Sequence, residues 1–230
     1  MRKFVRGQVE SVEMASASMR RIRICGPGLA GLDWTPGQQV QVLVGLGRQL
    51  GSRLPGPLRT YSVWAYSGDA VELCVYDHGD GPGARWARAM EPGRETQFTT
   101  PDGKFVLQPG AYHVFAGEET AAAAFGPMMR ALPAGAGLHG VIEVDGPDDR
   151  LPLPDAITWR YRNGASAASS TELVKAVAGL ELPAGPGVAY VAGEARTVQA
   201  VRKHLVEERG WPRRSVLVKP FWSPGKKGMD

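Results

Sequence analysis

The sequence predicts an N-terminal antiparallel β-barrel followed by a C-terminal α/β domain with a parallel sheet. Two observations lead to this fold class. Over about the first hundred residues, short strand-like segments follow one another at regular spacing, separated by Pro-Gly, Ser-Gly and Asp-Gly turn signals, as is typical of small barrels. After about residue 110, strand-like and helix-like segments alternate, which indicates a doubly wound sheet. We therefore expect one domain over residues 1–108 and a second over 109–230.

The barrel half contains six expected strands, at 4–14, 19–26, 38–46, 59–66, 70–77 and 95–101. Val40, Val42 and Val44 recur at every second position, as expected for a strand with one face in a core. The fifth strand is followed by HGDGPGARWA at 78–87, a glycine-rich turn that leads into a helix expected from Ala84.

In the second half we expect strands at 111–117, 139–146, 157–162, 187–193 and 215–222, and helices at 118–132, 169–180 and 194–210. Ser169 and Glu172 have the spacing of a capping box for the second helix. Val198, Val201 and Leu205 recur at helical spacing in the third, and Gly210 supplies its stop. Residues 162–170 are expected as a surface loop.

Composition excludes several classes of function. The formal net charge of +4 is small and scattered, unlike the clustered charge of a nucleic-acid-binding protein. No apolar run approaches the roughly 20 residues that cross a bilayer, and the opening segment lacks a signal-peptide core, so we expect a cytoplasmic protein without stable membrane association. Cys25 and Cys74 are expected as reduced core thiols. No metal site and no side-chain nucleophile or acid–base group is expected.

The segment RTYSVW, at 59–64, carries residue types that suit a flat nucleotide. Arg59 and Tyr61 share one strand face because side chains alternate along a strand. A guanidinium can fork onto a phosphate, and a tyrosine ring can lie against a heterocycle. The hydroxyl or backbone N–H of Ser62 can bond a ring nitrogen. The alternative interpretation is an ordinary amphipathic strand with a surface arginine.

The turn HGDGPG places Gly79, Gly81 and Gly83 immediately before a helix. Backbone N–H groups and the positive end of that helix would face an anion such as a pyrophosphate. The alternative is a plain loop into a helix that buries Trp86. Together, the strand and the turn point to FAD or FMN.

Five segments, RTYSVW, DHGDGPGARWA, AGEETAAAAFGPMM, VAGEARTVQAVRKHLVEERG and FWSPG, resemble in this order the motifs of the siderophore-interacting proteins, flavin-dependent ferric-siderophore reductases related to ferredoxin reductase. The chain departs from that pattern in three places. Ser62 stands for the usual threonine, GEETAAAA stands for a GDETALPA-like run, and Trp222 is followed by Ser223 instead of arginine. The second domain also has no GxGxxG after its first strand.

The resemblance implies an FAD-binding barrel and a nicotinamide-nucleotide domain, with NAD(P)H or ferredoxin as electron donor. It implies a cofactor-binding set of Arg59, Thr60, Tyr61, Ser62, His78, Gly81, Pro82, Gly83, Trp86, Gly117, Glu119, Thr120 and Trp222. Tyr61 would lie against the isoalloxazine ring, and His78 to Trp86 would line the phosphate and adenine end.

The expected substrate is a ferric siderophore, often an anionic chelate that basic residues would attract. The candidates for this contact are Arg48, Arg53, Lys219, Lys226 and Lys227, each of which can also be read as a solvated charge. We expect a monomeric reductase that brings no iron site of its own. Two alternatives remain: a flavin or ferredoxin-type reductase serving a protein partner, and a flavin- or siderophore-binding module without turnover.

Overall fold

The computed structural model describes residues 3–45 and 57–226. The chain divides into two compact units, Met1–Val106 and Leu107–Asp230. Each unit has its own sheet and its own hydrophobic core, so the two are considered separately below.

The first unit is a closed six-stranded barrel, as predicted. Its strands follow the order β1-β2-β5-β4-β3-β6, and all neighbours pair antiparallel. Their bounds are β1 Phe4–Ser16, β2 Met19–Cys25, β3 Gln39–Leu43, β4 Leu58–Ser67, β5 Ala70–Tyr76 and β6 Glu95–Thr99, with a 3-10 turn, η1, at Pro27–Leu29. Closure removes free sheet edges from this unit.

Alternate positions along the strands fill the barrel. Val40 and Val42 are fully buried and Val44 nearly so, as their spacing predicts. A short helix, α1 (Pro82–Arg88), follows β5 and buries Trp86 against this core. It begins two residues before the predicted start because Pro82 is already suited to the first helical turn, where it has no N–H to lose.

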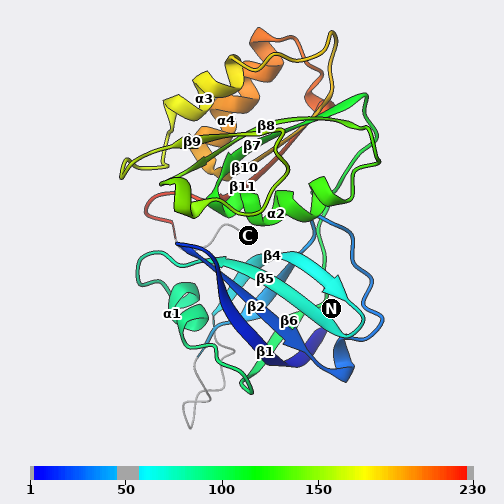
Figure 1. The fold of residues 1–230 in the computed structure, drawn as a ribbon, viewed down its shortest axis with the longest axis vertical. Coiled ribbons are helices and arrows are strands. Elements are labelled where there is room, and N and C mark those ends of the chain that lie inside the picture. The colour runs from blue at the N-terminus through cyan, green and yellow to red at the C-terminus, as the bar shows by residue number, and fades with distance from the viewer. Residues whose placement is uncertain (1–2, 46–56, 227–230) are drawn as a thin grey trace. The chain divides into compact units, whose positions relative to one another are not determined.

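The second unit is a five-stranded parallel sheet in the order β11-β10-β7-β8-β9. Figure 1 shows α3 and α4 on one face of this sheet and α2 on the other. The bounds are β7 Tyr112–Glu118, α2 Glu119–Arg130, β8 Gly137–Val144, β9 Ile157–Tyr161, α3 Thr171–Ala178, β10 Val188–Glu194, α4 Ala195–Lys203 and β11 Val216–Trp222, with 3-10 turns η2 Pro147–Asp149 and η4 Arg213–Ser215. A π-helical segment, η3 (His204–Glu208), extends α4.

The start of α3 differs from the sequence prediction by one residue. Ser170, not Ser169, is the N-cap, and its hydroxyl accepts from Leu173 N at 3.1 Å. Ser169 has a φ of 56°, and its N–H donates to Glu194 instead. Glu172 pairs with Lys175 at the surface rather than closing a capping box. A tertiary contact with β10 therefore decides the position of this cap.

Within the described ranges, no helix combines the length and apolar character needed to span a bilayer. Cys25 and Cys74 are free thiols, the second fully in the core. In the same ranges, no three side chains of His, Cys, Asp or Glu are grouped as metal ligands.

Candidate functional site

The barrel brings Tyr61 of β4 and Trp86 of α1 together, although the two residues come from separate motifs. Their rings stack with centroids 5.6 Å apart and an interplanar angle of 22°. Trp86, expected beside a bound nucleotide, is 3% exposed and lies in the barrel core, where it packs against the partly exposed Tyr61. Burial raises the pKa of the Tyr61 phenol above its usual range. The ring is therefore neutral and fixed in orientation.

Gly83 makes this arrangement possible. A β-carbon at this position would overlap the Tyr61 hydroxyl and would also lie 3.6 Å from Cγ of Arg59. The backbone of α1 therefore approaches the side chains of β4 closely, which only glycine permits. Arg59 and Tyr61 accordingly share one face of β4, as the alternation along RTYSVW predicts.

Arg59 differs from most of the barrel arginines around it. Its Nη1 donates to its neighbour's carbonyl, Leu58 O, at 2.7 Å. Within residues 3–45 and 57–226, no carboxylate forms an ion pair with it. By contrast, Arg20 and Arg88 both bind Asp77, at 2.8 and 2.6 Å. A half-buried guanidinium without a carboxylate partner is suited to an anionic ligand.

Two arginines of α1 bond the glycine-rich turn, and space remains beside its glycines. Arg88 Nη2 donates to Gly79 O at 2.7 Å, and Arg85 binds Asp80. A β-carbon on Gly79 or on Gly81 would meet no atom within 4 Å. The turn therefore has a defined backbone and free space beside it.

The other predicted barrel residues take different positions. His78 is exposed and stacks on Tyr76 with ring centroids 4.7 Å apart. Pro82 is the first residue of α1 and half-buried. Thr60 is half-buried opposite Gln41, and Ser62 is 9% exposed. The residues that the structure brings together are thus Arg59, Tyr61, Gly83 and Trp86.

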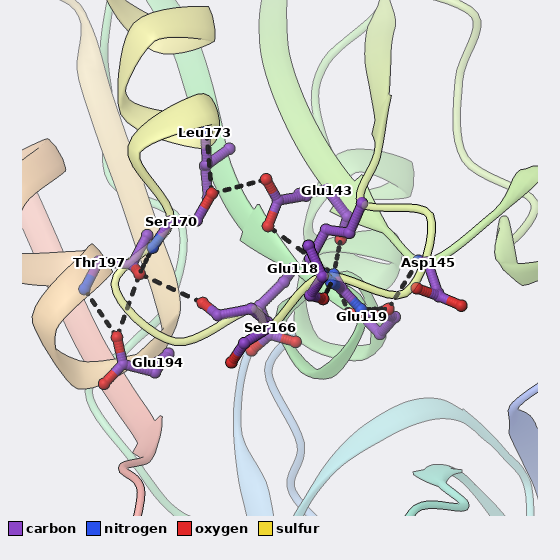
Figure 2. A network of polar contacts seen from close by, with 12 residues as sticks. Glu118, Glu119, Glu143, Asp145, Ser166, Ser170, Leu173, Glu194 and Thr197 are labelled. Atoms are coloured by element: carbon purple, nitrogen blue, oxygen red, sulfur yellow. Dashed lines mark hydrogen bonds and ion pairs between the residues drawn. The ribbon is translucent and has the colours of Figure 1, made fainter.

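In the second unit, buried acidic side chains gather where the parallel strands end. Glu118 ends β7, Glu143 lies one residue before the end of β8, and Glu194 ends β10. Together with Glu119 at the start of α2, these residues are all 1–2% exposed. Figure 2 shows the four carboxylates and the hydroxyl groups between them. Because the carboxyl ends of parallel strands share one edge, four glutamates meet there.

One arginine compensates part of this charge. The Arg162 guanidinium binds both oxygens of Glu119, at 2.9 Å from Nη1 to Oε2 and by a shorter contact from Nη2 to Oε1, and lies 3.8 Å from Glu143 Oε2. Ser170 Oγ donates to Glu143 Oε1 at 2.6 Å. Burial raises the pKa of Glu143. Glu119, which the resemblance places among the cofactor-binding residues, is bound by Arg162 and by Asp145 N.

The two glutamates that end β7 and β10 both cap the helix that follows. Glu118 accepts from Thr120 N at 2.9 Å, and Glu194 accepts from Thr197 N at 2.9 Å. Their pKa values shift in opposite directions. Burial and the neighbouring Glu119 carboxylate raise the pKa of Glu118 to about 7. Burial by itself would raise the pKa of Glu194. Hydrogen bonds from backbone N–H groups, including those of Ser169 and Thr197, instead keep this pKa below its usual value.

These caps have a consequence for nucleotide binding. In nucleotide-binding folds, phosphate groups commonly bind the free N–H groups at helix N-termini. Here the N-termini of α2, α3 and α4 are occupied by Glu118, Ser170 and Glu194. At each of these N-termini at least one backbone N–H is thus already bonded to a side chain of this chain.

Of the remaining predicted residues of the second unit, Gly117, Thr120 and Trp222 lie around Glu118, and the predicted lysines that the structure describes do not bond it. Gly117 allows close packing, since a β-carbon there would lie 2.5 Å from both Ala121 Cβ and Ala192 O. Trp222 is half-buried at the end of β11, and its Nε1 donates to Glu118 Oε1 at 3.0 Å. Lys219 is half-buried on β11 and Lys226 is exposed. Arg48, Arg53 and Lys227 lie outside the described residues.

Sequence reasoning missed Glu118, Glu143, Arg162 and Glu194. A signal for two of them was present, because Ala-Gly-Glu occurs at 116–118 and again at 192–194, each time between a strand and a helix. A repeated acid between a strand and a helix is suited to the positive end of that helix. Nothing in the sequence links Arg162 to Glu119, which lies 43 residues away.

Two family models match the chain, one in each unit. Residues 110–225 match the model of the siderophore-interacting protein family, and residues 49–105 match that of the siderophore-interacting FAD-binding domain. The chain belongs to the siderophore-interacting protein family. This agrees with the resemblance seen in its motifs. The part of the barrel unit from residue 49 to 105 is similar to the FAD-binding domain of that family.

Solved siderophore-interacting proteins have the same fold. A siderophore utilization protein from T. fusca is 27% identical, with a TM-score of 0.87 over 99% of this chain and 95% of that one. The siderophore-interacting protein SipS from Aeromonas hydrophila is 25% identical, with a TM-score of 0.84 over 98% and 94%. The FAD/NAD-binding domain of a nitric oxide dioxygenase from Vibrio cholerae, 17% identical with a TM-score of 0.75, shares the fold alone, over 95% of this chain and 98% of that one.

Among curated sequences, ferric vibriobactin reductase ViuB of Vibrio cholerae is 30% identical over 178 residues, which are 73% of this chain and 65% of ViuB. An uncharacterized protein of Mycobacterium tuberculosis is 30% identical over 187 residues, 74% of this chain and 66% of that protein. The chain thus spans slightly less than two thirds of the length of these relatives.

Proposed function

We propose that this chain is an FAD-dependent reductase of ferric siderophores, supplied with electrons by NADH, NADPH or a reduced ferredoxin. The observation that carries the proposal is the Tyr61–Trp86 stack beside Arg59 and an open glycine turn, inside a domain of the FAD-binding family. An aromatic platform, a cation without a carboxylate partner and an exposed glycine turn suit the ring and the phosphates of a flavin nucleotide.

The residues present fit FAD. Arg59 offers its guanidinium to a phosphate, and the space beside Gly79 and Gly81 admits an anion next to the backbone. Tyr61, supported by Trp86, offers a fixed ring to a planar heterocycle. Ser62 is 9% exposed and its side chain alternates to the other face of the strand, so only its backbone would be available to the polar edge of that heterocycle.

The cofactor would supply the electron chemistry, because a flavin accepts an electron pair and releases electrons singly, whereas a ferric chelate accepts one. The side chains of this chain then have to bind and orient. Arg59 holds the phosphate, and Tyr61 sets the plane of the ring. No side chain needs to act as an acid, a base or a metal ligand, since iron arrives with the substrate.

For the substrate we propose an anionic ferric chelate. The formal net charge of +4 favours such ligands. Lys219 and Lys226 are the described candidates for contact with it, and Arg48, Arg53 and Lys227 are candidates outside the described residues. The name of ViuB, ferric vibriobactin reductase, supports a ferric chelate as the class of substrate.

The electron donor is the open part of the proposal. The second unit has no GxGxxG after its first strand, and side chains already bond backbone N–H groups at the N-termini of α2, α3 and α4, so no phosphate loop supports tight NAD(P)H binding. This favours weak NAD(P)H binding and gives ferredoxin a specific argument as donor.

The test is an anaerobic comparison of donors. The protein is loaded with FAD and mixed with NADH, NADPH or reduced ferredoxin, and loss of flavin absorbance is followed by stopped flow. Ferric chelates are then added, and ferrous iron is trapped with a coloured ligand. Bleaching by one donor and reoxidation by a ferric chelate support the proposal. Flavin binding without reduction by any donor would contradict it and indicate a binding module.

A further inference from the structure

Glu118 and Trp222 are joined across a strand that separates them. In the sheet order β11-β10-β7, which Figure 1 shows, Trp222 ends β11 and Glu118 ends β7, with β10 between. The indole Nε1 nevertheless donates to Glu118 Oε1 at 3.0 Å. The contact therefore passes over the end of β10.

Gly193 of β10 provides the gap for this contact. A β-carbon there would lie 2.5 Å from Glu118 Oε1 and 3.1 Å from its Cδ, and the φ of 121° is one that other residues rarely adopt. The β10–β11 register also shifts between Gly193 and Glu194, so that Glu194 faces Trp222. The local backbone is thus shaped to let one side chain reach over it.

The Glu118 carboxylate is fixed by more than the indole. Thr120 N donates to Oε2 at 2.9 Å, and Thr120 Oγ1 donates to Oε1 at 2.5 Å. Three hydrogen bonds fix the orientation of the Glu118 carboxylate. Because the Trp222 indole bonds Oε1 of this carboxylate, its position is fixed as well. Glu194, the corresponding cap of α4, has no indole partner and bonds Ser169 and Thr197 instead.

We propose that Glu118 is a positioning residue for Trp222, holding the indole through the gap at Gly193 so that its ring receives the nicotinamide or other planar group of the electron donor. The identity of that group rests on the function proposed above. The hydrogen bond between Glu118 and Trp222 does not depend on that function. In this proposal Glu118 acts only through Trp222, by the hydrogen bond to its indole.

The hydrogen bond between Glu118 and Trp222 should depend on pH because other acidic side chains surround Glu118. Glu119 on α2, Glu143 on β8 and Glu194 on β10 lie at the same edge, with Arg162 bound to Glu119 as the compensating cation and Lys219 on the neighbouring β11. An ionised Glu118 accepts all three hydrogen bonds. A protonated one must place a proton where the donors point, which weakens the contact with the indole.

The first experiment observes the indole directly in the full-length protein. With ¹⁵N-labelled tryptophan, the six indole N–H resonances are recorded, and that of Trp222 is assigned with Trp222→Phe. We expect Glu118→Ala and Gly193→Ala to move the Trp222 resonance and to leave those of Trp64 and Trp86 unchanged. Glu118→Gln, which keeps an acceptor, should retain the resonance but remove its pH dependence around pH 7. A Trp222 resonance unaffected by both Glu118→Ala and Gly193→Ala overturns the proposal.

The second experiment measures the donor kinetics of the FAD-loaded protein. Glu118→Ala should raise the KM for the donor about tenfold, the size of one lost hydrogen bond to a charged group, with flavin content and kcat within about twofold. Glu194→Ala is the matched control, since it removes the other carboxylate cap and leaves the indole contact in place. A Trp222 resonance that moves without a change in KM overturns the proposed role. If no donor reduces the wild-type flavin, the proposed function fails instead, and the resonances still decide whether Glu118 holds Trp222.

Discussion

The Tyr61 hydroxyl lies against the α-carbon of Gly83, in the space that a β-carbon would require. This contact joins the strand that carries the aromatic platform to the helix that follows the glycine turn. Both predicted halves of the flavin site are thereby tied to one another by packing before any ligand binds.

Replacing Gly83 with alanine should displace Tyr61 and separate it from Trp86. We expect loss of stability of about 1–3 kcal/mol from overpacking, together with loss of bound FAD. Urea denaturation of the apoprotein and the ratio of flavin to protein after gel filtration measure the two effects. Gly81→Ala is the matched variant, because a β-carbon there meets nothing within 4 Å. It should keep apoprotein stability and weaken only FAD binding. Equal destabilisation by both would contradict this account.

Arg59→Ala should weaken FAD binding without unfolding the barrel. Its guanidinium has no carboxylate partner in the described ranges, so its removal leaves no buried acid unpaired. Loss of a charge-assisted contact of about 1.5–3 kcal/mol corresponds to a roughly ten- to hundredfold higher Kd, measurable by flavin fluorescence. Arg94→Ala, at an exposed pair with Glu91, is the control. A Kd unchanged by Arg59→Ala would remove this residue from the phosphate site.

Arg162→Met should destabilise the second unit strongly. It leaves Glu119 and Glu143 buried without their cation, for which we expect a loss of about 3–5 kcal/mol in the free energy of unfolding. The loss should become smaller at acidic pH, where the two carboxyl groups can take up protons. Urea unfolding at several pH values measures this, with exposed Arg196→Met as control. A loss independent of pH would show that packing, not charge, dominates.

Stability should fall as pH rises towards neutral because of Glu118. Its pKa is raised from 4.5 to about 7 in the folded protein, so between these values the folded state binds more protons than the unfolded state. The stabilisation from protonated Glu118 is complete below pH 4.5 and is lost as pH rises through about 7. Glu118→Gln should flatten this part of the curve of unfolding free energy against pH. The same slope in the variant and the wild type would assign the effect to another group, with Glu143 the next candidate.

The predictions from sequence were strongest where local pattern and packing agree. The valines of β3, the alternation of strands and helices after residue 110 and the shared face of Arg59 and Tyr61 follow from side-chain periodicity alone, and all are present. The α3 cap was placed one residue early because Glu194, which is distant in sequence, takes the N–H of Ser169. Long-range partners of this kind leave no local signal.

The sequence by itself determined the two sheets, their classes and the residues that suit a flavin, because hydrophobic periodicity and turn chemistry act over a few residues. Only the tertiary structure decided that Trp86 supports Tyr61 from the core, that four glutamates share one buried edge and that Glu118 reaches Trp222 past Gly193. These relationships depend on strand order and on the close approach of separate backbones, which no local pattern encodes. The energies of buried charges and stacked rings depend on which residues lie beside them. Tertiary packing therefore decides the details of the site.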